Sequence, residues 1–166
     1  MTKNALAQII SVLNAAKVRY LVVGGIAVIA HGYVRDTKDI DLLIQLEKDN
    51  LLAALHALAT IGYRPHIPVT FEDFANPEVR ATWIKEKQMK VLKLFCDAFW
   101  NTPIDVFVDD PLGFDEAYKR GKYYRLADNL DVPVCAYEDL VKLKLEAGRP
   151  RDLADLHELR LIRGES

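Results

Sequence analysis

The spacing of apolar side chains changes along the chain between a helical and a strand-like period. Apolar residues recur every three or four positions at 5–16 and at 47–61, and this spacing predicts two amphipathic helices. Gly62 follows the second of them, as a glycine commonly does just beyond the last helical turn. Short apolar or alternating runs predict strands at 20–23, 39–44, 89–95 and 103–108, and an apolar, alanine-containing run predicts a short helix at 26–31.

The C-terminal part of the chain returns mostly to helical spacing. Gly148-Arg149-Pro150 separates two closing helices, and Asp152 lies in the first turn of the second, where a carboxylate favours the helix dipole. The elements predicted here are a helix at 114–122, a hairpin of strands 123–126 and 132–135 around Asp128-Asn129, and helices at 137–147 and 151–162.

The segment 64–87 has little periodicity and contains three prolines. We predict a long connection here, with one helical turn near 71–74. Connections of this length often carry function or cover a site. Three aromatic residues of the segment are therefore candidates for the wall of an acceptor pocket: Phe71, Phe74 and Trp83.

Composition indicates one ordinary globular domain over residues 1–166. Hydrophobic residues make up 51% of the chain and charged residues 28%, close to the average for soluble proteins. The longest apolar runs fall short of the roughly 20 residues that span a bilayer. Cys96 and Cys135 have neither metal-ligand spacing nor a disulfide framework around them. We therefore expect a reduced, cytoplasmic protein with no membrane partner.

The charge of the chain is unevenly distributed. The formal net charge is −2, so the molecule as a whole does not carry the charge of a nucleic-acid-binding protein. Residues 119–163 are nevertheless rich in Lys and Arg, and a local basic face can guide an anionic ligand whatever the net charge.

Three aspartates are candidates for a metal site. Asp39 and Asp41 alternate along a predicted strand, so both project from one face while Ile40 points to the other. Adjacent carboxylates repel each other unless a cation or a proton lies between them, and magnesium is a hard ion that prefers oxygen ligands. Asp105 lies between two apolar residues of another predicted strand and would complete the set. We expect magnesium, or manganese, at these three carboxylates.

Gly24 and Gly25 lie between the first predicted strand and the short apolar helix. A Gly-Gly turn in this position lets backbone N–H groups approach a phosphate closely. The glycine pair alone is also compatible with a plain turn. Its combination with Asp39-x-Asp41 thirteen residues later, and with an isolated strand aspartate, is far more specific.

These motifs resemble those of the minimal nucleotidyltransferase superfamily, which is related to the catalytic core of DNA polymerase beta. The pattern of that superfamily is a Gly-Gly or Gly-Ser turn, a short helix, an acid-x-acid strand and a third acid on a later strand. The resemblance implies an α/β (α+β) fold with a mixed β-sheet flanked by helices and with C-terminal helices. It also implies a nucleoside triphosphate as substrate.

Segments 23–41 and 144–156 resemble more specifically the AbiEii-type toxins, which are paired with an antitoxin and transfer a nucleotide from a nucleoside triphosphate. The resemblance implies that Asp39 and Asp41 bind metal and that Asp105 binds metal or deprotonates the acceptor hydroxyl. The residues expected at the nucleotide are Gly24, Gly25, Arg35, Thr37, Lys38 and Asp152. Lys144 is expected as a catalytic residue that contacts phosphate.

Several of these residues have simpler interpretations. Lys144 and Lys38 are also compatible with solvated lysines, and His31 with a structural hydrogen bond. Arg149 and Arg151 are candidates for phosphate contacts or for a helix cap. AbiEii toxins commonly carry a further helical domain that helps to hold the acceptor, so we expect a partner subunit or a dimer to supply that surface here.

The resemblance leaves the acceptor open. The 3′ end of tRNA is the first expectation, since it fits the toxin family and the basic C-terminal third, and it would bring a cognate antitoxin as partner. A small hydroxylated molecule is the second, because short antibiotic nucleotidyltransferases share this core. A non-catalytic binding module is the third, although it would have no reason to keep three clustered carboxylates.

Overall fold

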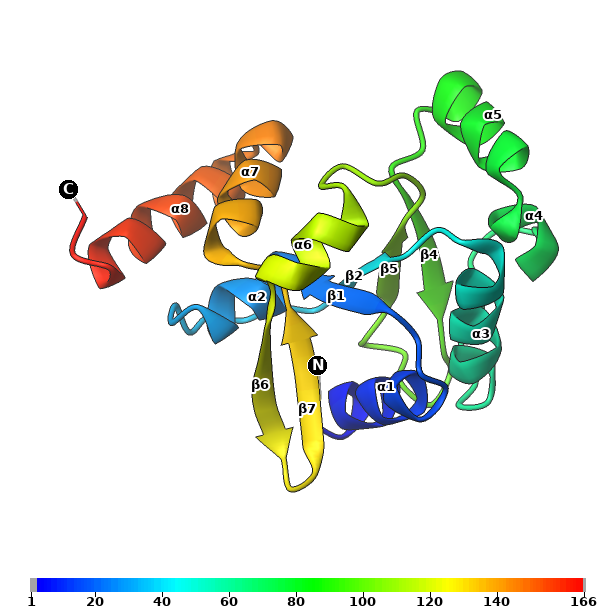
Figure 1. Ribbon diagram of the computed structural model, residues 1–166, viewed down its shortest axis with the longest axis horizontal. Coiled ribbons are helices and arrows are strands. Elements are labelled where there is room, and N and C mark those ends of the chain that lie inside the picture. The colour runs from blue at the N-terminus through cyan, green and yellow to red at the C-terminus, as the bar shows by residue number, and fades with distance from the viewer. Residues whose placement is uncertain (1–2, 166) are drawn as a thin grey trace.

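The computed structural model describes residues 3–165, which fold around one seven-stranded mixed sheet (Figure 1). The strand order across the sheet is β3-β4-β5-β2-β1-β7-β6. The strands are β1 (Tyr20–Val23), β2 (Ile40–Ile44), β3 (Arg64–Pro65), β4 (Val91–Phe95), β5 (Ile104–Phe107), β6 (Lys122–Ala127) and β7 (Leu130–Val134). The helices are α1 (Lys3–Ala15), α2 (Gly24–Ala30), α3 (Lys48–Ala59), α4 (Phe71–Ala75), α5 (Pro77–Lys87), α6 (Phe114–Arg120), α7 (Tyr137–Ala147) and α8 (Pro150–Ile162).

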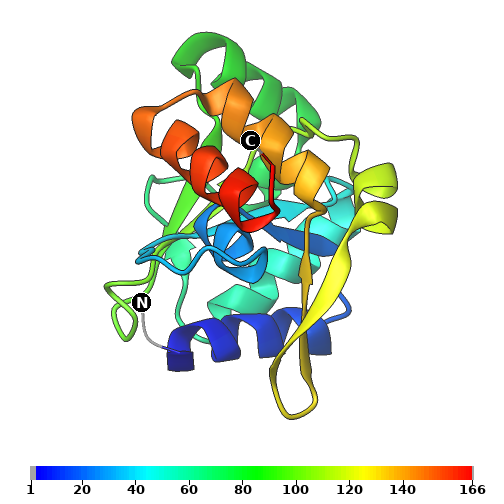
Figure 2. The ribbon, with the colours of Figure 1, turned by 90° about the vertical axis from the view of Figure 1, so that its left-hand side faces the viewer.

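Helices cover both faces of this sheet. On one side, α1 packs against α3 and β7, and α3 in turn contacts α4. On the other side, α2 lies against β1 and β2, and α7 packs on α2 with α8 beside it. Figure 2 shows α7 and α8 next to each other, away from α1. The α/β class with a mixed sheet, flanking helices and C-terminal helices is therefore confirmed.

The central strands β1 and β2 form the core and are buried on both faces, and Asp41 is the one residue of the two strands that is only half-buried. Ile40, Leu42 and Ile44 of β2 are buried, as are Tyr20 and Val22 of the antiparallel neighbour β1. Because successive side chains of a strand point to opposite faces, Asp41 projects on the face opposite to Ile40. The first residue of α2, Gly24, lies against the Asp41 side chain on that face.

Two sequence-based expectations need correction. The segment 64–87 is not a long connection, because it contains β3, the short helix α4 and the eleven-residue helix α5. Phe74 and Trp83 do not wall a pocket either: both are buried, and their rings stack on each other with centroids 6.2 Å apart. Phe71 packs edge-on against His56 of α3, so the aromatic residues of this segment attach α4 and α5 to the rest of the fold.

Within residues 3–165, no helix has both the length and the apolar character needed to cross a membrane.

Candidate active site

A cavity of about 490 Å³ opens beside the C-terminal end of β1, between the start of α2 and the junction of α7 and α8. Its wall brings together segments that lie more than a hundred residues apart in sequence. All ten residues expected at the metal or at the nucleotide line it: Gly24, Gly25, Arg35, Thr37, Lys38, Asp39, Asp41, Asp105, Lys144 and Asp152.

The carboxylates come from a row of paired residues across the sheet. Asp41 of β2 is the parallel partner of Asp105 of β5, and Asp105 is the antiparallel partner of Lys93 of β4. Partners on adjacent strands project from the same face, with the strands about 4.8 Å apart. Asp39 lies just before β2 and joins the same group. The register therefore places three acids and one lysine side by side.

Lys93 is the member of this group that the sequence did not identify. Its Nζ lies 2.8 Å from Oδ1 of Asp105 and 3.9 Å from Oδ2 of Asp39. The alternation of β4 places Lys93 opposite to the buried Leu92 and Leu94, which is a visible signal. The pairing of β4 with β5 is what brings it to the carboxylates.

Burial and mutual repulsion make these carboxylates costly to ionise. Burial raises the pKa of Asp41 to about 6, with further contributions from the negative charges of Asp105 and Asp39. Burial likewise raises the pKa of Asp105, against the opposing effect of the Lys93 ammonium. Oδ1 of Asp105 is buried, and its contact within the described part of the chain is the Lys93 ammonium at 2.8 Å. Clustered, desolvated carboxylate oxygens suit a hard divalent cation.

The three acids nevertheless do not form a preformed coordination shell. No group of three or more His, Cys, Asp or Glu side chains in residues 3–165 is arranged to hold a metal ion. Asp39, Asp41 and Asp105 thus line the same cavity, but their carboxylates are not arranged around a common metal position. The Lys93 ammonium contacts Asp105 instead.

Gly24 and Gly25 form the first turn of α2 and do not precede that helix as a separate turn. Gly24 has a φ of +66°, and a β-carbon on it would overlap Oδ2 of Asp41. A β-carbon on Gly25 would overlap Oγ1 of Thr37. The two glycines therefore leave the space in which the side chains of Asp41 and Thr37 lie.

A buried network of charges forms the opposite wall of the cavity. Lys144 of α7 donates to Oδ1 of Asp152 at 3.0 Å and to Oδ2 of Asp155 at 2.9 Å. Arg35 donates to both oxygens of Asp155 at 2.7 and 2.8 Å. Lys144 and the two aspartates are almost completely buried, so the interpretation of Lys144 as a solvated helix lysine is wrong.

Asp152 is enclosed by protein donors. It receives hydrogen bonds from Lys144 and from the backbone and side chain of Arg149, the N-cap residue of α8. Burial alone would raise the pKa of Asp152, but these hydrogen bonds hold it at about 2. Arg149 thus takes part in the helix cap, while its side chain remains 74% exposed at the edge of the cavity.

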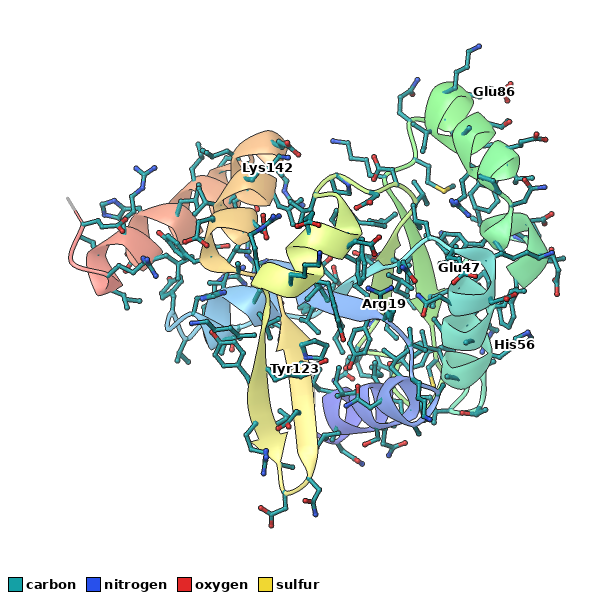
Figure 3. The ribbon with its side chains drawn as sticks, viewed as in Figure 1. Arg19, Glu47, His56, Glu86, Tyr123 and Lys142 are labelled. Atoms are coloured by element: carbon teal, nitrogen blue, oxygen red, sulfur yellow. The ribbon has the colours of Figure 1, made fainter. Side chains whose placement is uncertain are left out.

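The remaining candidates occupy the rim or lie away from the cavity. Arg151 donates to the backbone oxygen of Asp36, and Lys38 is exposed. Lys142, one of the cations of the basic segment 119–163, lies on α7 (Figure 3) and donates to the backbone oxygen of Pro111. His31 donates from Nε2 to the backbone oxygen of Cys135, which agrees with the structural interpretation.

Comparisons with known proteins agree with this fold. Residues 2–165 match the model of a family described as "Nucleotidyl transferase of unknown function (DUF2204)". A comparison with curated proteins found no significant match.

Two solved structures share the fold at low sequence identity. One is the lincosamide antibiotic adenylyltransferase LnuA with lincomycin bound, at a TM-score of 0.62 and 17% identity over 96% of this chain and 97% of that chain. The other is a candidate nucleotidyltransferase (TM1012) from Thermotoga maritima, at a TM-score of 0.57 and 14% identity over 93% of this chain and 89% of that chain. The family match covers nearly the whole chain, and the protein therefore belongs to the nucleotidyl transferase family DUF2204.

Proposed function

We propose that this nucleotidyltransferase moves a nucleoside monophosphate from a nucleoside triphosphate to an acceptor hydroxyl and releases pyrophosphate. The observation that carries the proposal is the pairing of Asp41 with Asp105 across β2 and β5, directly beside Gly24. Asp39, Asp41 and Asp105 would hold magnesium or manganese. When bound, the metal would neutralise charge on the phosphates and make an acceptor hydroxyl easier to deprotonate.

The protein's own residues would position the triphosphate. Gly24 and Gly25 bring backbone close to the carboxylates, with no side chain in the way of a phosphate. Lys144 contributes a buried positive charge that lowers the pKa of Asp41, and we propose that this charge also faces the phosphates. The exposed cations Lys38 and Arg149 would bind the outer phosphates, and Arg35 and Thr37 would contact the nucleotide from the loop before β2.

Asp152 would act on the nucleotide indirectly. Its oxygens accept hydrogen bonds from Lys144 and Arg149, so it is already engaged by protein donors. We propose that Asp152 orients these two cations toward the cavity and does not contact the nucleotide itself. An intact set of carboxylates and cations around one cavity favours catalysis over a non-catalytic binding module.

For the acceptor, we propose a small hydroxylated molecule. The cavity is of the size that small ligands occupy in proteins. LnuA, an adenylyltransferase for a lincosamide antibiotic, has the same fold over nearly the same length, so this fold suffices for such an acceptor. The continuous basic face expected for RNA is also reduced, because Lys144 is buried and Arg149 is paired with Asp152.

The 3′ end of tRNA is the second candidate acceptor. It is favoured by the exposed cations at the rim of the cavity, Lys38, Arg149 and Arg151, which could follow a phosphate backbone. In that case the protein would be the toxin of a toxin–antitoxin pair, with a cognate antitoxin as its protein partner.

The identity of the labelled acceptor separates the two candidates. The protein is incubated with each α-labelled nucleoside triphosphate, magnesium, and either total tRNA or a pool of hydroxylated small molecules that includes lincosamides and aminoglycosides. We expect label in the small-molecule pool at a rate that changes little between about 50 and 200 mM salt. Label in tRNA, at a rate that falls steeply with salt and falls further in Arg149→Ala/Arg151→Ala, would contradict the small-molecule proposal and support the tRNA acceptor.

A further inference from the structure

Lys93 contributes a positive charge directly within the group of three carboxylates. Its side chain is only 33% exposed, and its ammonium lies between Asp105, at 2.8 Å, and Asp39, at 3.9 Å. The opposite wall of the cavity has its own internal balance of charge, since Lys144 and Arg35 are paired with Asp152 and Asp155. Among the described residues, Lys93 is the one cation in ion-pair contact with Asp39 and Asp105, and Asp41 has no ion-pair partner.

The register of the sheet fixes where Lys93 can act. Lys93 pairs with Asp105, and Asp105 pairs with Asp41, so the three residues form one row across β4, β5 and β2. From this position the four-carbon stem of the lysine carries its ammonium over Asp105 toward Asp39. The oxygen it contacts, Oδ1 of Asp105, is buried, and Lys93 is its one ion-pair partner within residues 3–165. The ammonium thus stands beside the oxygen that a divalent cation would use.

We propose that Lys93 is a built-in counter-cation that substitutes for the divalent ion and competes with it. Without bound metal, Lys93 stabilises the carboxylates and keeps Asp105 turned toward β4. When a divalent cation binds, its charge repels the ammonium, and Lys93 must leave Asp105 for the ligand set to close. The inference rests on the proposed cation site, and it makes Lys93 a positioning residue that acts through Asp105.

Two observations that otherwise stand apart follow from this role of Lys93. Three carboxylates with mutual repulsion occupy one site, and yet they are not arranged as a metal shell within residues 3–165. If the Lys93 ammonium neutralises part of this negative charge and holds Asp105 toward β4, both the tolerated repulsion and the absence of a metal shell among these residues are explained. It also explains why a flexible lysine suits this position, since its ammonium can move by rotation about the stem while β4 stays in place.

Manganese affinity provides the test. The full chain is stripped of metal with EDTA and dialysed, and Mn²⁺ binding is then measured by electron paramagnetic resonance for wild type, Lys93→Met and Lys93→Arg. Lys93→Met removes the charge and keeps most of the stem. We expect it to bind Mn²⁺ at least about tenfold more tightly, because one positive charge near the ion is lost. Lys93→Arg keeps the charge and should remain within about threefold of wild type.

Thermal unfolding of the same proteins provides a second readout. In EDTA, Lys93→Met should melt at a lower temperature than wild type, because its three carboxylates have lost their counter-charge. Mn²⁺ should raise its melting temperature by more than it raises that of wild type. Lys119→Met is the matched control, since it removes an exposed lysine that is paired with Glu116, away from the site. It should change neither the Mn²⁺ affinity nor the metal-induced shift.

The outcomes separate the two proposals. Equal Mn²⁺ affinity in wild type and Lys93→Met, or weaker binding in the variant, would overturn the role of Lys93 and leave the cation site standing. If neither protein binds Mn²⁺, with or without a nucleoside triphosphate, the cation site itself is wrong and the role of Lys93 fails with it. Lys93→Arg keeps the proposal testable if Lys93→Met does not fold, since a change of about tenfold in Mn²⁺ affinity with the charge retained would contradict competition by charge.

Discussion

Gly24 combines a left-handed backbone with a lack of space for a β-carbon. Its φ is +66°, and an added β-carbon would overlap the carboxylate of Asp41. The sequence alone relates this glycine to the close approach of a phosphate. The structure adds a requirement that holds without any ligand, namely that Asp41 can occupy its place only beside a residue with no side chain.

Substitution of Gly24 separates these two requirements. Gly113→Ala is the matched control, because Gly113 has a φ of +69° and nothing within 4 Å of its β-carbon position. The control should lose about 1 kcal/mol of unfolding free energy through backbone strain alone. Gly24→Ala should lose about 1 to 3 kcal/mol more through overlap with Asp41. The measurement is urea denaturation, and equal losses in the two variants would refute the close packing of Gly24 on Asp41.

The pKa of Asp41 gives a pH-dependent prediction. Burial, with Asp105 and Asp39, raises it from 3.8 to about 6, so the folded protein holds this proton more strongly than the unfolded chain does. The contribution of Asp41 to the stability of the metal-free wild type should therefore fall as the pH rises from about 4 to about 6, with no further fall above that range. Asp41→Asn should lack this loss.

The difference in unfolding free energy between Asp41→Asn and wild type isolates the effect of this one group. Between about pH 4 and pH 6 it should shift in favour of the variant by about 2 to 3 kcal/mol, at about 1.4 kcal/mol per pKa unit. Urea denaturation in EDTA at several pH values provides the measurement. A difference that stays constant with pH would show that the pKa of Asp41 is not raised.

The sequence identified some residues of this site and missed others for a physical reason. Asp39, Asp41 and Asp105 could be predicted because acids in apolar, alternating strands are conspicuous, and because their order resembles that of a known family. Lys93 and Asp155 could not, because their partners are determined by contacts between distant segments. A lysine in a half-buried strand is ordinary until β4 pairs with β5.

At the scale of elements, α5 shows where periodicity gives no signal. Only Arg80 and Trp83 are buried in this eleven-residue helix, so no apolar stripe runs along it. Its start is marked instead by Asn76, whose side chain accepts from the backbone N–H of Glu78, followed by Pro77 at the first helical position. The prolines that suggest a loop thus include the one that begins a helix.

The junction of α7 and α8 depends on its buried ion pairs. Asp155 of α8 accepts hydrogen bonds from Arg35 and from Lys144 of α7, and its side chain is 2% exposed. Asp155→Asn removes the negative charge, which leaves Arg35 without its carboxylate partner and Lys144 with Asp152 alone. We expect a loss of about 3 kcal/mol in unfolding free energy, because an unpaired buried charge is costly.

Glu116→Gln is the control for that variant. It removes one partner of the Glu116–Lys119 pair, in which the side chains are 70% and 72% exposed. Its effect should stay below about 1 kcal/mol, since exposed ion pairs contribute little. Chemical denaturation of both variants checks the comparison, and similar losses would contradict a structural role for the buried network.

At the scale of the whole molecule, the sheet assembles the site from distant segments. The order β3-β4-β5-β2-β1-β7-β6 places β5 beside β2, and β7 beside β1, by parallel pairings that bridge long stretches of sequence. The sequence predicted most strands and helices and, by resemblance, the fold. It could not predict the register, because register depends on which side chains of separate strands pack together.

The fate of the α-phosphate tests most directly whether this protein transfers a nucleoside monophosphate to an acceptor. A nucleoside triphosphate labelled at the α-phosphate is incubated with wild type, Asp105→Asn, magnesium and the acceptor pools. We predict that wild type attaches the label to an acceptor and releases one pyrophosphate per label transferred. Asp105→Asn should be slower by about 100-fold or more while still unfolding cooperatively. Release of the label as free nucleotide alone, or undiminished transfer by Asp105→Asn, would contradict the account.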